Sequence, residues 1–136
     1  MATYPLSEAY ADGNVLSAAN VNSITEGVND LAFGQFQAET GTSYTLALTD
    51  VAKVVTLTNA AAITLTVPPN SSVAFPIGSQ ILLYQGGAGA VTITPGSGVT
   101  VNSNGSKLDT NGQYSVGGLL KLDTDEWVAF GNLTAP

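Results

Sequence analysis

The residues best equipped for chemistry form one short acidic stretch near the end of the chain, residues 123–126 (Asp-Thr-Asp-Glu). Carboxylate oxygens are the ligands that calcium prefers, but the stretch lacks the glycine and the downstream glutamate of a calcium loop. Glycoside hydrolysis needs two carboxylates that face each other across a cleft, which one turn does not provide. The sequence therefore favours a hairpin turn between Leu122 and Trp127, with calcium binding as the alternative.

A glycine-rich run at residues 86–89 (Gly-Gly-Ala-Gly) superficially resembles a phosphate-binding loop. No Lys-Ser/Thr pair and no helix follows it, so the backbone amides and the lysine that hold a phosphate are missing. We expect a tight turn between strands at this position.

The aromatic residues near the end of the chain offer a third kind of chemistry, stacking on sugars. Trp127 alternates with Ala129, and Val128 alternates with Phe130, so one of these two faces should enter a core. Core or intersubunit packing is the favoured role, and a carbohydrate platform is the alternative. The same alternative applies to Tyr84 and Tyr114.

The residue types that are missing restrict the function further. The chain has no histidine, cysteine or arginine and only three basic residues, with a formal net charge of −7. The usual zinc, iron and copper ligands and every Ser-His or Cys-His pair are therefore absent. Nucleic acids and anionic membranes should repel the chain. We expect no enzyme activity, no catalytic residue, no cofactor and no metal site, and the opening residues resemble neither a secretory signal nor a membrane span.

The elements that carry these residues are predicted from the period-two pattern that begins after Gly41. Short alternating segments are separated by turn residues such as Asn104-Gly105 and Asn111-Gly112. We predict a mainly β fold, an antiparallel β-sandwich or barrel of about nine strands, over residues 41–136. No βαβ unit appears, which disfavours a parallel sheet, and no fixed-length repeat runs through the domain.

Residues 1–40 form the other predicted part, an extended N-terminal arm followed by one short α-helix that begins near Ser17. The helix carries an apolar stripe but has Gly27 in its middle, so it is marginal without a partner surface. That surface could be its own β domain, a short bundle around a symmetry axis, or a different protein. The predicted partner and oligomer contacts are Tyr4, Leu6, Tyr10, Leu16, Val21, Ile24, Val28 and Leu31.

Two regions resemble proteins of tailed bacteriophage particles. Residues 13–22 (Gly-Asn-Val-Leu-Ser-Ala-Ala-Asn-Val-Asn) are similar to the opening of many virion proteins, where this pattern precedes a short helix. Residues 62–68, 78–81 and 85–93, with the later residues 111–114 and 125–131, resemble small β modules of head fibres, capsid decoration proteins and tail-fibre tips. Such modules commonly trimerise. The chain has no long shaft repeat, which favours a small accessory protein.

The resemblance implies a non-enzymatic capsid decoration or cement protein that attaches by its N-terminal region and forms a homotrimer. Its partners would be the major capsid protein or other virion structural proteins. It would be made in the host cytoplasm and would lie on the outer capsid surface. The alternative is a tail-fibre or baseplate adaptor that binds host surface carbohydrate. A carboxylate-based glycosidase is the least favoured reading, because ten acids without histidine leave few catalytic combinations.

Overall fold

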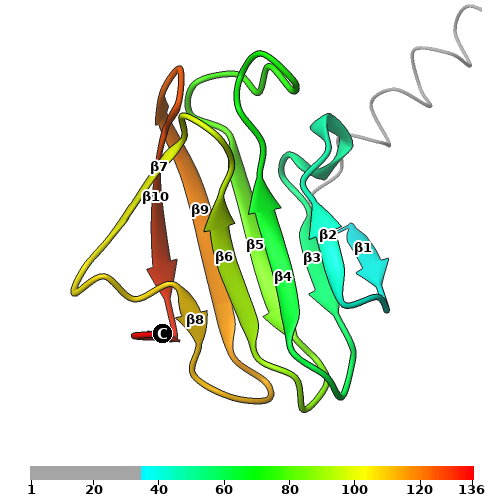
Figure 1. Cartoon of the computed structure of the whole chain (residues 1–136). Helices are drawn as coiled ribbons and strands as arrows, with labels where there is room; N and C mark the ends of the chain where they lie inside the picture. Colours follow the sequence, from blue (N-terminus) through cyan, green and yellow to red (C-terminus); the bar gives the residue numbers. More distant parts are fainter. Residues whose placement is uncertain (1–34) are drawn as a thin grey trace, which may run out of the picture. The chain divides into compact units, whose positions relative to one another are not determined.

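The computed structural model describes residues 35–136, which form two β-sheets (Figure 1). The strands of the large sheet are β1 (Phe36–Glu39), β3 (Val54–Leu57), β5 (Gln80–Gln85), β7 (Thr100–Ser103), β9 (Val116–Asp123) and β10 (Glu126–Gly131). Those of the small sheet are β2 (Ser43–Thr45), β4 (Ile63–Val67), β6 (Val91–Pro95), β8 (Asp109–Thr110) and β11 (Leu133–Thr134). One 3₁₀ turn, η1 (Leu48–Asp50), precedes β3. The predicted mainly β fold is confirmed, and the β structure begins before the predicted boundary at residue 41.

The first six strands alternate between the two sheets, so that the chain winds back and forth between two layers (Figure 1). Strands β1, β3 and β5 are parallel neighbours in the large sheet, and β2, β4 and β6 are parallel neighbours in the small sheet. The predicted antiparallel arrangement is therefore wrong for this half of the fold, and each of the two sheets is mixed. Parallel strands need a long crossover, and here each crossover is a strand of the opposite sheet rather than a helix.

The later strands complete the two sheets, and most of them pair in antiparallel orientation. Strand β9 lies antiparallel between β5 and β10, and β10 pairs in parallel with the edge strand β7. In the small sheet β8 is antiparallel to both β6 and β11. The described residues thus contain eleven strands rather than the predicted nine. The short strands β1, β8 and β11 were not predicted, whereas two predicted segments within residues 113–122 correspond to the single strand β9.

The parallel register contains a repeat that the sequence analysis did not detect. Val54 pairs with Leu82 in the large sheet, and Ile63 pairs with Val91 in the small sheet. Both offsets are 28 residues (82 − 54 and 91 − 63), so the coil β3–β4 is followed by a second coil, β5–β6, of matching layout. Only two coils share this offset, and their side chains differ at most positions, which hides the repeat.

The core lies between the sheets and is built from alternate residues of each strand. Its members from the large sheet include Val55, Leu57, Ile81, Leu83, Leu119 and Trp127, and those from the small sheet include Ile63, Leu65, Val67, Val91 and Ile93. Trp127 is 1% exposed and meets Phe75 edge to face, with ring centroids 5.3 Å apart. Its core packing confirms the favoured role for this residue. Each such side chain stabilises the fold by about 1.5–3 kcal/mol through burial.

A buried lysine fastens the long connection between β4 and β5 to the large sheet. The ammonium of Lys121 donates to Asn70 Oδ1 at 2.7 Å and to the carbonyl of Phe75 at 2.8 Å. It also lies 5.9 Å from the centroid of the Trp127 ring. The backbone N–H of Asn70 donates to Asp125 in the β9–β10 hairpin at 2.8 Å. The connection is therefore held by charge-assisted hydrogen bonds as well as by apolar packing.

The glycine-rich turn at residues 86–89 lies directly against the preceding turn of the winding. The Gly89 amide donates to the carbonyl of Asn59 at 2.8 Å, and the Gly86 amide donates to the carbonyl of Leu57 at 2.8 Å. A Cβ on Gly89 would overlap the carbonyl of Ala61. The predicted turn is confirmed, but it joins the two sheets rather than two strands of a hairpin.

Because these two turns lie so close together, adding one methyl group at Gly89 should strongly reduce the stability of the fold. Gly89→Ala should lower the free energy of unfolding by about 2–3 kcal/mol, because the backbone oxygen it meets cannot rotate away. The measurement is urea unfolding followed by the fluorescence of Trp127. Gly41→Ala is the matched control, since a Cβ there makes only ordinary contacts of 3.7 Å or more. Equal effects of the two substitutions would contradict the turn stacking.

Candidate functional site: an exposed apolar sheet face

The outer side of the large sheet carries many large apolar side chains that are exposed or half-buried in the described part of the chain, together with the polar side chains of Thr56, Gln80 and Glu126. Alternate residues of each strand point away from the core, and on these strands many of them are large and hydrophobic. We call this surface the exposed apolar face and define it by Phe36, Val54, Leu82, Val116, Leu120, Leu122, Val128 and Phe130. Five of the eight are between 39% and 70% exposed, and Val54, Leu120 and Val128 are half-buried. Contiguous apolar patches of this kind mark interaction sites on soluble proteins.

One row of residues continues across five strands of the exposed apolar face. The register places Phe36, Val54, Leu82 and Gly118 side by side on β1, β3, β5 and β9, with Phe130 beside Gly118 on β10. A Cβ at Gly118 would overlap the ring of Phe130, so the ring lies over this glycine. Glycine within a strand commonly marks such a close approach. The ring fills the gap left by Gly118 and continues the apolar surface.

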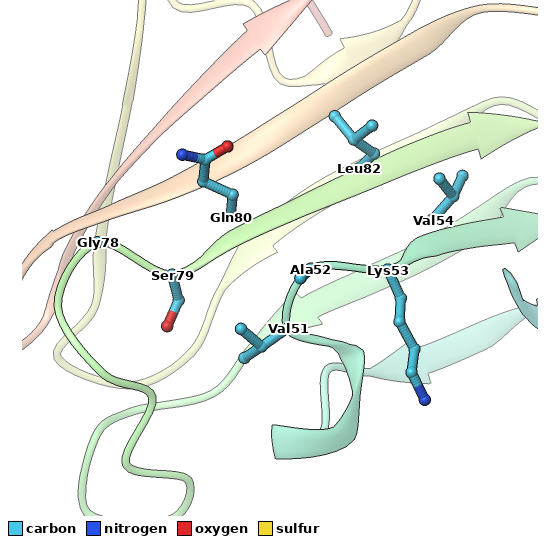
Figure 2. A pocket seen from close by; sticks show the side chains of 8 residues that line it. All are labelled: Val51, Ala52, Lys53, Val54, Gly78, Ser79, Gln80 and Leu82. Atoms are coloured by element: carbon cyan, nitrogen blue, oxygen red, sulfur yellow. The ribbon is translucent and has the colours of Figure 1, made fainter. Parts of the chain in front are cut away.

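The face contains a hollow where β3 and β5 begin. It has a volume of about 460 Å³ and is lined by Val51, Ala52, Lys53, Val54, Gly78, Ser79, Gln80 and Leu82. Figure 2 shows Val54 and Leu82 projecting from neighbouring strands toward the same side. Its lining is mainly apolar, with one ammonium group, from Lys53. The residues that line the hollow include neither a nucleophile paired with a base nor a pair of carboxylates.

A buried carboxylate positions one wall of this hollow. Asp50 is fully buried at the end of η1, and its Oδ2 accepts hydrogen bonds from Tyr44 Oη at 2.7 Å and the Ala47 amide at 2.8 Å. The amide of Ala52, whose backbone is left-handed with a φ of 62°, donates to the carbonyl of Gln80 at 2.8 Å. Together these bonds fix the path of residues 51–54 along the edge of the hollow.

The same contacts raise the pKa of Tyr44 well above its ordinary value. Burial disfavours the phenolate first, and the hydrogen bond to Asp50 and the negative charge of that carboxylate act in the same direction. The second oxygen of Asp50, Oδ1, is buried without a hydrogen-bond partner among the described residues. The pair is therefore a structural one, in which the phenol is held as a hydrogen-bond donor.

The outer side of the small sheet has an entirely different chemistry. The register aligns Ser43, Thr64 and Thr92 in one row and Thr45, Thr66 and Thr94 in the next. Their side chains point away from the core because Leu65 and Ile93, which lie between the threonines, are buried. Hydroxyl groups of this kind are readily hydrated. Of the two outer faces, the exposed apolar face is thus the one suited to dry docking.

The residues of the acidic stretch lie in one hairpin, and their carboxylates bond to different partners. The predicted hairpin turn is confirmed, since β9 and β10 are joined by Thr124 and Asp125. Asp123 Oδ1 accepts from the Thr124 amide, Asp125 Oδ1 from the Asn70 amide, and Glu126 Oε1 from Asn102 Nδ2. Within residues 35–136 there is no cluster of three or more acidic, histidine or cysteine side chains that could bind a metal. No helix in that range is long and apolar enough to cross a bilayer.

The predicted contact residues of the N-terminal part all lie outside the described residues. They are Tyr4, Leu6, Tyr10, Leu16, Val21, Ile24, Val28 and Leu31. Among the predicted aromatic candidates, Tyr114 is 69% exposed, Tyr84 is half-buried, and Phe130 belongs to the exposed apolar face.

Sequence reasoning missed the exposed apolar face, although its signal is present. Pairs such as Val54-Val55, Leu82-Leu83 and Leu119-Leu120 put apolar side chains on both sides of a strand. That pattern is typical of strands covered on both faces. Comparisons with family models, curated proteins and solved structures found no match for this chain.

The Tyr44–Asp50 contact predicts a defined dependence of stability on pH. Because folding raises the pKa of Tyr44 above its ordinary value of 10.0, its contribution is complete below that pH and is lost as the pH rises further. Tyr44→Phe should lower the free energy of unfolding by about 1–2 kcal/mol at pH 7, because the buried carboxylate loses a donor. Above pH 10, the free energy of unfolding should also decrease less with rising pH in Tyr44→Phe than in the unmodified chain.

Urea unfolding at pH 7 and at pH 10.5 measures both effects. Tyr84→Phe is the control, because the Tyr84 hydroxyl has no hydrogen bond within residues 35–136. If Tyr44→Phe and Tyr84→Phe behave alike at both pH values, the assigned role of Asp50 is wrong.

Proposed function

We propose that this chain is a non-enzymatic structural protein of a phage particle, a capsid decoration or cement protein. In this proposal it attaches through its N-terminal region, oligomerises as a trimer, and has the major capsid protein or other virion structural proteins as partners. The observation that carries the proposal is the exposed apolar face, which a protein acting alone in water would have little reason to retain. The sequence resemblance to virion proteins supports the particle setting.

The proposed mechanism is cementing by many weak apolar contacts. Each copy adds about 25 cal/mol of stabilisation per Å² of apolar area that it buries on its neighbours. Because attachment sites repeat around a particle, linked copies bind with an avidity that exceeds the affinity of one contact. Charged residues make up only 10% of the chain, so charge should contribute little to the attachment.

An apolar attachment predicts that bound protein resists salt. Washing purified particles in about 1 M NaCl, where the Debye length is about 3 Å, should leave the bound amount unchanged. The measurement is the quantity of this protein in pelleted particles before and after the wash. Wholesale release by salt alone would contradict the proposal.

A matched pair of variants tests the N-terminal part of the same proposal. Ile24→Asp places a charge in the predicted apolar stripe, whereas Asn22→Asp places one on its predicted polar side. Incorporation into particles should fall for Ile24→Asp and persist for Asn22→Asp. Equal incorporation of the two variants would remove the stripe from the attachment mechanism.

A specific observation favours a second candidate function, an adaptor that binds host surface carbohydrate. The side chain of Tyr114 is 69% exposed. The backbone of the same residue is left-handed, with a φ of 72°. Its amide donates to the carbonyl of Gln85 at 2.7 Å, and the neighbouring Gln113 side chain donates to the carbonyl of Gly86 at 3.0 Å. Strained residues of this kind cluster at functional sites, and an exposed ring beside amide groups suits a sugar.

Replacing Tyr114 by glycine relieves the backbone strain and removes the ring, so its effects on stability and on polysaccharide binding can be measured separately. Tyr114→Gly should leave the protein equally stable or up to about 1 kcal/mol more stable, because glycine adopts positive φ without strain. It should abolish any binding to polysaccharide extracted from host cells, measured by calorimetry. Unchanged polysaccharide binding in Tyr114→Gly, or its absence in the unmodified chain, would reject the adaptor function.

A further inference from the structure

We infer that the exposed turn between β7 and β8 is a site of spontaneous covalent modification, at which Asn104 loses its side-chain amide through a cyclic imide. The sequence contains two Asn-Gly pairs, Asn104-Gly105 and Asn111-Gly112, and both were predicted as turns. The structure distinguishes them, because the first asparagine can react and the second is held in place. This inference does not depend on the proposed function.

The reaction needs only the chain itself and water. The backbone nitrogen of the glycine attacks the side-chain carbonyl carbon of the preceding asparagine, and a new C–N bond closes a succinimide ring. The side-chain nitrogen leaves as ammonia, taking up the proton that the glycine nitrogen loses. Water then opens the ring at either carbonyl and gives aspartate or isoaspartate. Glycine favours the ring closure because it has no Cβ to shield its nitrogen or to restrict the backbone.

Both reacting groups of the first pair are accessible. Asn104 is exposed, and its side-chain amide makes no hydrogen bond within residues 35–136. The backbone nitrogen of Gly105 makes none in that range either. The turn is closed by a backbone hydrogen bond from the Ser106 amide to the carbonyl of Ser103 at 3.1 Å. Opening of this exposed bond therefore lets the glycine nitrogen reach the carbon that it attacks.

The backbone of the turn favours that opening. Gly105 has a φ of 75°, which glycine adopts without strain. The next residue, Ser106, is also left-handed, with a φ of 55°. Residues with a Cβ adopt this conformation at a cost in energy, so the turn holds strain that its opening releases.

The second Asn-Gly pair has the same chemistry but is fastened to the segment between β10 and β11. The side chain of Asn111 donates to Asn132 Oδ1 at 3.2 Å, and the Asn111 amide donates to the carbonyl of Asn132 at 3.2 Å. Asn132 is itself fixed, because its amide donates to the carbonyl of Val116 at 2.9 Å and its side chain donates to Ser115 Oγ at 3.3 Å. Attack by the Gly112 nitrogen requires the Asn111 side chain to rotate, and these bonds oppose the rotation.

The modification changes the charge around Lys107. The Cε of Lys107 lies 3.4 Å from the position that a Cβ on Gly105 would take, so the lysine side chain lies against this turn. Ser103, Asn104 and Lys107 also line a hollow of about 370 Å³ beside Phe130. Aspartate at position 104 adds a negative charge near the ammonium group, and isoaspartate also lengthens the backbone of the turn. The reaction therefore alters the charge of this hollow and leaves the core residues untouched.

Peptide mapping of the full chain measures both rates in one experiment. Cleavage after lysine releases residues 54–107 and 108–121 as separate peptides, one for each Asn-Gly pair. When the folded protein is kept in mildly alkaline buffer, conversion should be about tenfold faster at Asn104 than at Asn111, because hydrogen bonds restrain only the second side chain. Tandem mass spectrometry identifies the modified residue in each peptide. No detectable conversion of Asn104, or a rate no higher than that of Asn111, would overturn the inference.

Two controls test whether the fold causes the difference. In urea, where the chain is unfolded, the two Asn-Gly pairs should react at similar rates. In Asn132→Ala, which removes the acceptor of the Asn111 side chain, conversion of Asn111 should become several-fold faster while that of Asn104 stays unchanged. Circular dichroism verifies that this variant is folded. A difference that persists in urea, or an unchanged rate at Asn111 in the folded variant, would reject the assigned protection.

Discussion

The fold depends on the requirement that each crossover between the two sheets stack tightly on the one before it. Strands β1, β3 and β5 reach their parallel neighbours only after the chain has crossed into the small sheet and returned. The turns at these crossings must follow the strand spacing of about 4.8 Å, which leaves little room for side chains. Gly89 meets this requirement by having none, and the amides at Gly86 and Gly89 bind the backbone of the preceding turn. If the turns separate, the two sheets lose their common register.

This winding also explains why the two outer faces differ so strongly. A strand with period two has one side for the core and one side free, and the register then sorts the free sides into rows. In the small sheet the rows contain hydroxyl groups, such as Thr64 beside Thr92. In the large sheet they contain apolar groups, such as Val54 beside Leu82. The described domain therefore has one outer face lined by hydroxyl groups and one that is mainly apolar.

The sequence was sufficient to predict those features that depend on residues close together in the chain. Alternation predicted the mainly β fold, the acidic stretch predicted the β9–β10 hairpin, and the position of Trp127 predicted its place in the core. Parallel pairing could not be predicted in the same way, because a buried strand alternates identically whether its neighbour runs with it or against it. The absence of helical connections was misleading, since here a strand of the opposite sheet makes the connection.

The exposed apolar face was missed for a related reason. Leu82 and Leu120 come from strands far apart in sequence, and only the register places them in neighbouring strands of one surface. The residues first predicted to make contacts belong to the N-terminal part and lie outside the described residues, so their role remains a prediction. Within the described residues, the exposed apolar face was visible in the sequence only as adjacent pairs of apolar residues.

The 28-residue offset between the two stacked coils suggests how the domain can change in size. Because one coil adds a strand to both sheets at once, duplication of such a segment widens the domain by one strand spacing while its two ends keep their structures. The added turn must again have small residues where Gly87 and Gly89 stand, or the new coil cannot settle on the old one. Growth of this kind is stepwise, and it enlarges the apolar face and the threonine rows by the same increment.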